Sequence, residues 1–339
     1  MTTTRDTFEY HTANFTGYNV LVTGASGVLG FGVAQALVAA GANVTVLQRS
    51  ASGLTGVREI RGSVTDADDV AKAVDGVDSV IHIAAKVSVS GPLADYEHVN
   101  IEGTRTLLHA AQNAGVSRWV HISSPSVAHS GDSIIGDGAG AADTQAARGH
   151  YAATKAAGEL LALAADSPTF RVLVLRPHLM WGPGDTQLTE RIIDRARQNR
   201  LPLLDGGTAL VDTLFLVNAV EGIIAALEAV DTTRGEALVL TNGQPRPIGE
   251  MIRRIAVAGG AKEPTLDLPS GVAKAAGSII EAVWDAEKRG DEPPITRFLA
   301  EQMSTAHWFD QRRTHHVLQW KPRISLDKGF QLTTQYYRH

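Results

Sequence analysis

The chain has 339 residues, of which 44% are hydrophobic and 20% charged, so it is long enough to form one large α/β unit or two unequal domains with packed cores. Its formal net charge is −5 and no basic stripe is visible, which argues against a nucleic-acid partner. Cysteine is absent, the N-terminus lacks the apolar stretch of a signal peptide, and no apolar run is long enough to span a membrane, so we expect a cytoplasmic protein without disulfides or thiolate chemistry.

The first half of the chain alternates β-branched runs with Ala-rich stretches. Strands are predicted over 18–24, 43–48, 79–85, 118–124 and 171–177, and helices over 30–41, 66–76, 97–115 and 149–165. Continuous apolar strands that alternate with helices are typical of a parallel sheet covered on both faces. The predicted fold class is therefore α/β, with a doubly wound parallel (Rossmann) sheet.

The pattern changes after Pro177, where Gly- and Pro-containing loops interrupt short helices. One further unit, a helix over 214–230 and a strand over 236–243, is expected to return to the sheet. The sequence thus predicts a dinucleotide-binding domain of residues 14–177 plus 212–242. Residues 178–211 plus 243–339 are predicted to form a smaller, mainly helical cap that shapes a substrate pocket.

A glycine-rich turn, TGASGVLG, joins the first predicted strand to the first helix, with Gly24, Gly27 and Gly30 at GxxGxxG spacing. Glycine permits both the tight turn and the close approach of a pyrophosphate, and the following helix N-terminus offers unpaired N–H groups to the anion. Because the motif lies between a strand and a helix at the start of a βαβ unit, we interpret it as a dinucleotide-binding turn.

The second predicted strand ends at Gln48, Arg49 and Ser50, without the carboxylate that usually holds an NAD ribose. A guanidinium can pair with the 2′-phosphate of NADP. We therefore expect NADP(H) to be favoured over NAD(H), with a solvated surface arginine as the alternative.

Tyr151 and Lys155 lie four residues apart and so share one face of the helix predicted over 149–165. A neighbouring ammonium is expected to lower the pKa of the phenol, which could then exchange a proton with a carbonyl or alcohol oxygen. The fourth strand ends in Ser123, Ser124 and Pro125, at the edge where such sheets bind ligands.

The motifs TGASGVLG, HISSPS, YAATK and RPHLMWGPGD together resemble the extended short-chain dehydrogenase/reductase superfamily, over nearly the whole chain from about Tyr18 to the segment KPRISLDKGF. The resemblance implies that Ser124 orients a carbonyl, that Tyr151 is the acid/base and that Lys155 tunes Tyr151 and holds the nicotinamide ribose. It also implies a cofactor-binding set, which comprises Gly24, Ser26, Gly27, Val28, Leu29, Gly30, Arg49, Ser50, Ala84, Ala85, Lys86, Asn100, Tyr151, Lys155 and Pro177. For Asn100 a purely structural role is an equal alternative. Ser63 departs from the family, which usually has Asp near the adenine.

Two segments, 176–219 and 292–310, resemble the branch that holds 3β-hydroxysteroid dehydrogenases, sterol dehydrogenases and the 2-alkyl-3-oxoalkanoate reductases of bacterial olefin biosynthesis. This resemblance implies an enzyme that interconverts a 3-oxo and a 3-hydroxy group on a large hydrophobic substrate. We favour reduction of a 2-alkyl-3-oxoalkanoic acid, and sterol or steroid dehydrogenation is the alternative. Ser126, His178 and Trp181 are candidates for the substrate pocket, and a homodimer is expected by analogy with the superfamily.

The segment 271–288 places Val272, Ala275, Ile279, Ala282 and Val283 at helical spacing. We favour a core face for this stripe. The alternative is a lid that could also contact a membrane surface. The twelve histidines form no HxxxH or HExxH pair, so no metal site is expected.

Two other functions remain open. A nucleotide-sugar epimerase or dehydratase would share the fold and the Tyr–Lys pair, but the apolar C-terminal segment and the missing acid after the second strand argue against it. A non-catalytic NADP sensor would have no need for Ser124, Tyr151 and Lys155 together.

Overall fold

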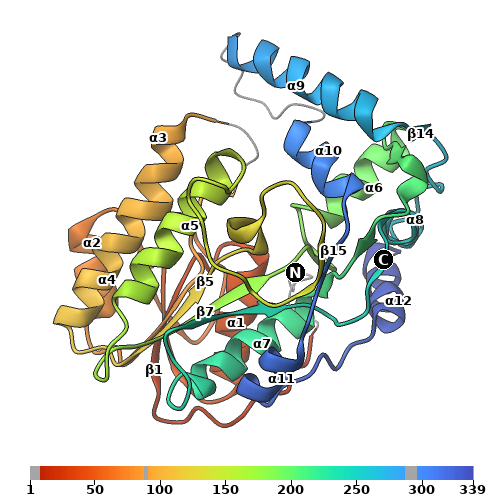
Figure 1. Ribbon diagram of the computed structural model, residues 1–339. Helices are drawn as coiled ribbons and strands as arrows, with labels where there is room; N and C mark the ends of the chain where they lie inside the picture. The colour runs from red at the N-terminus through yellow and green to blue at the C-terminus, as the bar shows by residue number, and fades with distance from the viewer. Residues whose placement is uncertain (1–7, 88–90, 287–295, 339) are drawn as a thin grey trace.

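A seven-stranded parallel sheet forms the centre of the molecule (Figure 1). The computed structural model describes residues 8–87, 91–286 and 296–338. Across the sheet the strands are β12 (Glu236–Leu240), β7 (Arg171–Pro177), β5 (Arg118–Ile122), β4 (Ser79–His82), β1 (Asn19–Thr23), β2 (Asn43–Gln48) and β3 (Val57–Arg61). The order reverses between β1 and β4, so the predicted doubly wound α/β fold is confirmed.

Helices cover both faces of this sheet because successive strand residues point to opposite sides. Val20 and Val22 of β1 pack in a core under α1 (Val28–Ala39), α7 (Leu216–Ala229) and α11 (Arg312–Leu318). Leu21, between them, packs in the opposite core under α2 (Ala67–Val74), α4 (Thr104–Asn113) and α5 (Gly149–Ala164). Each strand therefore contributes apolar side chains to two cores.

Two features of this half were not predicted. The edge strand β3 has the sequence VREIR, and it lacks the continuous apolar run of a central strand because only one of its sides is paired. The segment 97–115, which was predicted as one helix, begins with a π-helical turn, η1 (Glu97–Gly103), and continues as α4. The short helix α3 (Leu93–Tyr96) precedes η1.

The rest of the chain forms a smaller unit at one side of the sheet's carboxyl edge. Its helices are α6 (Thr189–Arg197), α8 (Ile248–Ala258), α9 (Ser270–Ala286), α10 (Arg297–Ser304) and α12 (Leu326–Tyr337). A four-stranded sheet of β13 (Arg246–Pro247), β10 (Leu210–Val211), β15 (His307–Phe309) and β6 (Ile134–Asp137) lies beside them, with two-stranded pairs β11 (Leu214–Phe215)–β8 (Met180–Trp181) and β14 (Asp267–Leu268)–β9 (Leu203–Leu204).

Some segments pack with the other unit from the one predicted: β6, from the range predicted for the dinucleotide-binding domain, pairs with β15, and α11 packs the opposite way. Val317, Leu318 and Trp320, which the sequence assigned to the cap, pack in the core beneath α7. They do so because α11 returns to the sheet and lies along α7 and β12, and the Thr314 hydroxyl donates to the Val239 carbonyl at 2.9 Å.

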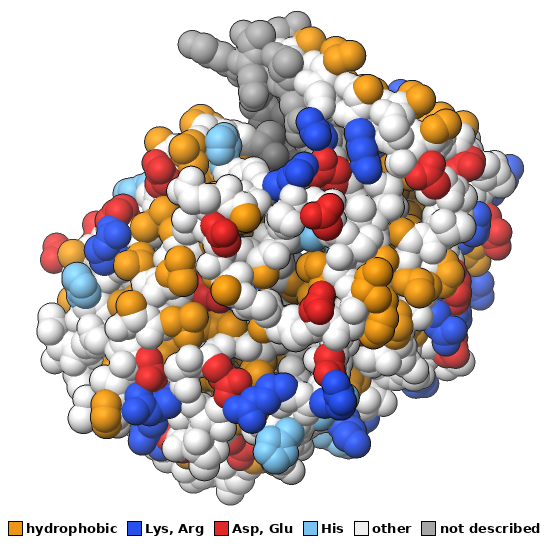
Figure 2. Space-filling model, in the orientation of Figure 1, with side chains coloured by type: hydrophobic (Ala, Val, Ile, Leu, Met, Phe, Trp, Pro, Cys, Tyr) orange, Lys and Arg blue, Asp and Glu red, His pale blue; other side chains and the backbone are white. Residues whose placement is uncertain are grey.

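Helix α9 lies at the outer side of the cap, and its apolar stripe faces away from the protein (Figures 1 and 2). Val272, Ile279 and Val283 are 58%, 66% and 41% exposed, so the core interpretation favoured for this stripe is wrong for these residues. The opposite face packs on α10 instead, where Ala273 is buried and a Cβ at Gly277 would meet the backbone of Arg297. The Ala282 side chain lies outside the described part. Within the described residues no helix combines the length and apolarity that crossing a bilayer requires.

Candidate active site

The glycine-rich turn joins β1 to α1 and leaves no room for side chains. Gly24 has a φ of +76°, and a Cβ there would lie 3.0 Å from the backbone nitrogen of Ala84. A Cβ at Gly30 would lie 2.4 Å from the Gly24 carbonyl oxygen. Helix α1 begins after Gly27 with no side chain capping it. The turn therefore offers unshielded backbone N–H groups to an anion, as a pyrophosphate-binding site requires.

The loop after β4 passes beside this turn and is held by Asn100. The Thr23 hydroxyl accepts from the backbone N–H of Ala84 at 3.0 Å. The Asn100 amide accepts from Lys86 N at 2.8 Å and donates to Lys86 O at 3.2 Å and to Thr154 Oγ1 at 3.1 Å. These contacts tie the loop to β1 and η1, and the Thr154 contact joins Asn100 to helix α5, so Asn100 holds the loop in place; its contact with the cofactor stays a prediction.

The carboxyl ends of β2 and β3 form a second part of the candidate cofactor site. Gln48 is 4% exposed, yet both polar atoms of its amide lack a hydrogen-bond partner. Arg49 and Arg61 line a depression here together with Ser63 and Thr65. A buried amide without partners beside two guanidinium groups fits the hydroxyl and phosphate groups of an adenosine ribose. Arg61 was not among the predicted residues, because the strand that carries it was missed.

Ser124, Tyr151 and Lys155 come together at the carboxyl ends of β5 and β7. Ser124 precedes the 3₁₀ turn η2 (Pro125–Ala128), and its hydroxyl lies 2.9 Å from the Ser126 hydroxyl. Tyr151 and Lys155 project from the first turns of α5. The Lys155 ammonium, 5% exposed, donates to the carbonyl of Ile122 at 2.5 Å. Ser124 and Tyr151 therefore share one pocket edge, and the Lys155 side chain lies behind it, on the Ile122 carbonyl.

The electrostatics of this site differ from the sequence-based expectation. Burial raises the pKa of Tyr151, and a hydrogen bond with Ser124 opposes that rise. Burial also lowers the pKa of Lys155 to about 8, although the Glu159 carboxylate opposes this change. Lys155 is not among the groups that shift Tyr151, since its ammonium is engaged by the Ile122 carbonyl. The predicted lowering of the phenol pKa is wrong for this state of the protein, which holds a protonated phenol at neutral pH.

A cavity of about 190 Å³ opens beside the triad. Its lining residues are Ser124, Pro125, Ser126, His129, Ile134, Tyr151, Pro177, His178, Leu179, Leu299, Gln302, His307 and Phe309. Ser126 and His178, two of the candidates for the substrate pocket, line this cavity, and Pro177, which was predicted to lie beside the nicotinamide, lines it as well. Most of the lining is apolar, which suits a hydrophobic substrate.

Trp181 is not part of this lining. It is completely buried, its indole donates to Thr213 Oγ1 at 3.0 Å, and its ring packs on Phe215 and Phe330. The prediction that Trp181 lines the substrate pocket is therefore not supported, because the loop after β7 turns this side chain into the core of the cap.

The far side of the pocket is formed by residues that the sequence did not single out individually. His307 and Phe309 lie on β15, and Leu299 and Gln302 lie on α10. The sequence drew attention to these residues only through the segment 292–310 as a whole, because this segment resembles one branch of the family. His129 follows η2, where a loop of no regular pattern gave no indication.

The comparisons agree with this geometry. Residues 20–240 match the NAD dependent epimerase/dehydratase family. A 2-alkyl-3-oxoalkanoate reductase of Stenotrophomonas maltophilia is 36% identical over 91% of this chain and 96% of its own length. The reductase of the same name from Shewanella oneidensis is 30% identical over 92% of this chain and 84% of its own length. A 3-beta-hydroxysteroid dehydrogenase of Mycolicibacterium neoaurum is 28% identical, over 94% and 90%.

Solved structures show the same fold. MoeE5 in complex with UDP-glucose and NAD superposes with a TM-score of 0.72 at 24% identity, over 94% of this chain and 98% of that one. UDP-glucuronic acid 4-epimerase from Bacillus cereus, in complex with NAD, gives a TM-score of 0.73 at 20% identity, over 94% and 98%. With the glycine-rich turn and the family match, these findings confirm the predicted resemblance: the chain belongs to the NAD dependent epimerase/dehydratase family of extended short-chain dehydrogenases, and it is an NAD(P)-dependent oxidoreductase.

Proposed function

We propose that this enzyme uses NADPH to reduce a 2-alkyl-3-oxoalkanoic acid to the corresponding 3-hydroxy acid. The observation that carries the proposal is the largely apolar cavity beside Ser124 and Tyr151, in a chain 36% identical to a 2-alkyl-3-oxoalkanoate reductase. An apolar pocket buries alkyl chains, and the two hydroxyl groups at its edge fix the position of a ketone oxygen.

Each residue of the triad has a role in this reaction. Ser124 donates a hydrogen bond to the ketone oxygen and holds it beside Tyr151. The raised pKa of Tyr151 keeps the phenol protonated at neutral pH, which is the form that reduction needs, because the phenol gives its proton to the oxygen. Lys155, with a pKa of about 8, remains mostly charged at pH 7, and it would stabilise the phenolate that is left once its ammonium turns from the Ile122 carbonyl toward Tyr151.

The cofactor would be held by the glycine-rich turn, the loop at Ala84 and Ala85, and the ends of β2 and β3. When bound, the nicotinamide supplies the hydride. Lys155 would hold its ribose, and Pro177 would lie beside its ring. We favour NADP(H) because Arg49 and Arg61 both line the depression at the adenosine end. The nearby carboxylates are engaged: Asp66 caps α2 by accepting from Asp68 N and Asp69 N, both at 3.0 Å.

The test is a substrate panel. Purified enzyme with NADPH is assayed at 340 nm against 2-alkyl-3-oxo acids, unbranched 3-oxo acids and 3-oxosteroids. We expect the highest kcat/KM for the branched acids. Faster turnover of the steroids would instead support sterol or steroid dehydrogenation.

The same assay separates two other activities. A nucleotide-sugar epimerase recycles its cofactor and shows no net change in absorbance during turnover, and a sensor protein shows no turnover at all. The coenzyme is tested by comparing KM for NADPH and NADH, where an equal or lower KM for NADH would overturn the NADP(H) proposal. Size-exclusion chromatography with light scattering tests the expected homodimer.

A further inference from the structure

Three histidines meet at the side of the substrate pocket away from the central sheet. His129 follows η2, His178 follows β7 and His307 lies on β15. The His129 and His307 rings are joined through their Nε2 atoms at 2.9 Å, and the His178 and His307 ring centroids are 6.0 Å apart. Neither the catalytic roles nor the cofactor site described above uses these side chains.

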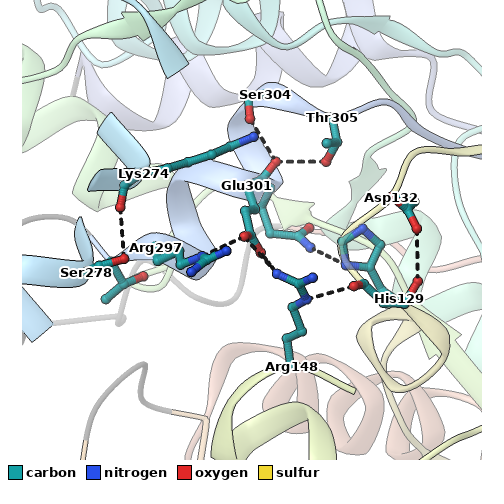
Figure 3. A network of polar contacts seen from close by, with 12 residues as sticks. His129, Asp132, Arg148, Lys274, Ser278, Arg297, Glu301, Ser304 and Thr305 are labelled. Carbon is teal, nitrogen blue, oxygen red and sulfur yellow. Dashed lines mark hydrogen bonds and ion pairs between the residues drawn. The ribbon is translucent and has the colours of Figure 1, made fainter. Parts of the chain in front are cut away.

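The lining residues of the cavity within the described part of the chain include no Lys, Arg, Asp or Glu. The guanidinium groups near His129 are already paired, as Figure 3 shows: Arg148 contacts both carboxylate oxygens of Glu301, at 2.9 and 3.1 Å, and Arg297 donates to Glu301 at 3.0 Å. Glu301 is 5% exposed, so its charge requires these partners. A carboxylate that enters the pocket therefore meets histidines rather than a permanent cation.

The hydrogen bonds around His307 define where it can accept a proton. The Thr305 hydroxyl donates to the Glu301 carbonyl at 2.7 Å, so it can only accept from His307 Nε2, which lies 3.0 Å away. We place the proton of neutral His307 on Nε2, where it faces His129 Nε2; His129 then holds its proton on Nδ1, and the Gln302 amide, 3.3 Å away, turns its oxygen toward that nitrogen. This leaves Nδ1 as an unprotonated acceptor, and Nδ1 is buried without a hydrogen-bond partner in a side chain that is 1% exposed.

His178 has the complementary arrangement. Its Nδ1 lies 2.7 Å from the backbone carbonyl of Asp212, which can only accept, so Nδ1 carries the proton and Nε2 is the acceptor. Both rings line the cavity, and each carries one imidazole lone pair. A carboxylate cannot hydrogen-bond to a lone pair, but it can do so once the imidazole has taken up a proton.

We propose that His307 binds the carboxylate of the substrate and takes up a proton at Nδ1 when it does so. The inference rests on the proposed function, which supplies a substrate with a carboxylate two carbon atoms from the reacting carbonyl. An unpaired carboxylate and an unpaired imidazolium are each disfavoured in an apolar pocket, but together they neutralise one another. Proton uptake at Nδ1 supplies both the charge and the missing donor, and it leaves the bonds to Thr305 and His129 in place.

The surrounding groups keep the histidine neutral before the substrate enters. Burial, together with the facing rings of His178 and His129, lowers the pKa of His307 to about 3. Asp132, Glu301 and Arg148 act on His129 rather than on His307. The Asp212 carboxylate is turned away to Thr241 Oγ1, at 2.7 Å, and to Gln244 N, at 3.0 Å.

Calorimetry of the enzyme–NADPH complex, which cannot exchange hydride with a 3-hydroxy acid, tests the proposal. The ligands are a 2-alkyl-3-hydroxyalkanoic acid, which is the product and keeps its carboxylate, and the methyl ester of the same acid. Titrations in two buffers of different ionisation enthalpy at pH 7.5 give the number of protons taken up. We expect uptake of about one proton with the acid and none with the ester, and a Kd for the acid that rises about tenfold per pH unit above pH 7.

The variant His307→Gln should weaken binding of the acid at least tenfold more than binding of the ester, and it should abolish the proton uptake. His316→Gln, a change of the same kind at an exposed position, should alter neither. Thermal unfolding checks that both variants are folded, and the proton count on the unaltered enzyme does not depend on either variant.

The outcomes separate the two proposals. If the acid binds without proton uptake, or if His307→Gln weakens acid and ester equally, the role of His307 is refuted while the proposed substrate stands. If Arg148→Gln removes the preference for acid over ester and His307→Gln does not, the guanidinium is the cation and the role of His307 is again refuted. If the enzyme does not bind the acid but reduces 3-oxosteroids, the proposed substrate is wrong and this inference fails with it.

Discussion

The buried ion pair between Arg176 and Glu159 allows a direct test of the packing around the site. Arg176 lies at the end of β7 and Glu159 lies on α5, one turn after Lys155; their side chains are 1% and 0% exposed. Arg176 Nε and Nη2 donate to the two carboxylate oxygens at 3.0 and 2.5 Å, and Nη1 donates to the carbonyl of Ala139. One guanidinium thus joins the sheet, the catalytic helix and the loop that precedes it.

Replacing Glu159 by Gln removes the negative charge that is paired with a fully buried guanidinium. The loss of one partner of a buried pair costs about 3–5 kcal/mol, because the other charge is left without compensation. In a chain of 339 residues, each kcal/mol lowers the melting temperature by roughly 1.4 °C, so a decrease of about 4–7 °C is expected. Replacing both residues, Arg176→Met with Glu159→Leu, removes the unpaired charge and should restore part of the loss.

Urea-induced unfolding followed by tryptophan fluorescence measures these changes. The control is Asp310→Asn, which breaks an ion pair of 2.6 Å whose arginine, Arg312, is 92% exposed; we expect no measurable change there. The reasoning is refuted if Glu159→Gln lowers the free energy of unfolding by less than about 1 kcal/mol, or if the double variant is less stable than the single one.

Three further predictions concern the site and the cap. Tyr151→Phe should reduce kcat about 10²–10⁴-fold without lowering the melting temperature, and a variant within tenfold of the original rate would exclude Tyr151 as the proton donor. Burial lowers the pKa of His178 to about 4, whereas a histidine in the unfolded chain has a pKa near 6.5. As the pH falls from 6.5 to 4, the unfolded chain takes up a proton at His178 that the folded protein does not. The folded protein therefore loses roughly 3 kcal/mol of stability over this range. His178→Gln should flatten this part of the stability–pH curve, and an unchanged curve would contradict the pKa. Ile279→Ala, on the exposed face of α9, should change the free energy of unfolding by less than about 0.5 kcal/mol, whereas Ile252→Ala, which is 3% exposed, should cost about 2–5 kcal/mol; equal effects would show that the α9 stripe is buried in solution.

Much of the fold could be predicted because its central strands are encoded locally. A strand that is buried on both faces needs a continuous apolar run, and β1, β2, β4, β5 and β7 all have one. The edge strand β3 escaped prediction because three of its five residues, VREIR, are charged and it has neither an apolar run nor a regular alternation. Polarity at the edge of a sheet resembles that of a loop when only the sequence is considered.

The apolar stripe of α9 and the position of Trp181 show a second limit. Periodicity identifies a helix with an apolar face, but it does not say whether another element covers that face. Helix α9 turns its small residues toward α10, and Val272 and Ile279 toward solvent. Trp181 was predicted to line the pocket because it closely follows β7, yet its ring packs on Phe215 and Phe330 in the core of the cap.

By itself, the sequence determined the parts of this protein whose chemistry lies within a few neighbouring residues: the glycine-rich turn, the Tyr151–Lys155 pair on one helix, and the serines at a strand end. Only the tertiary structure decided what the substrate meets, because His129, His178 and His307 come from segments up to 178 residues apart. It also decided the protonation of the site, since the pKa of Tyr151 and of Lys155 depends on burial and on partners such as Ser124 and Glu159. Burial is a property of the packed chain, and no local pattern of residues specifies it.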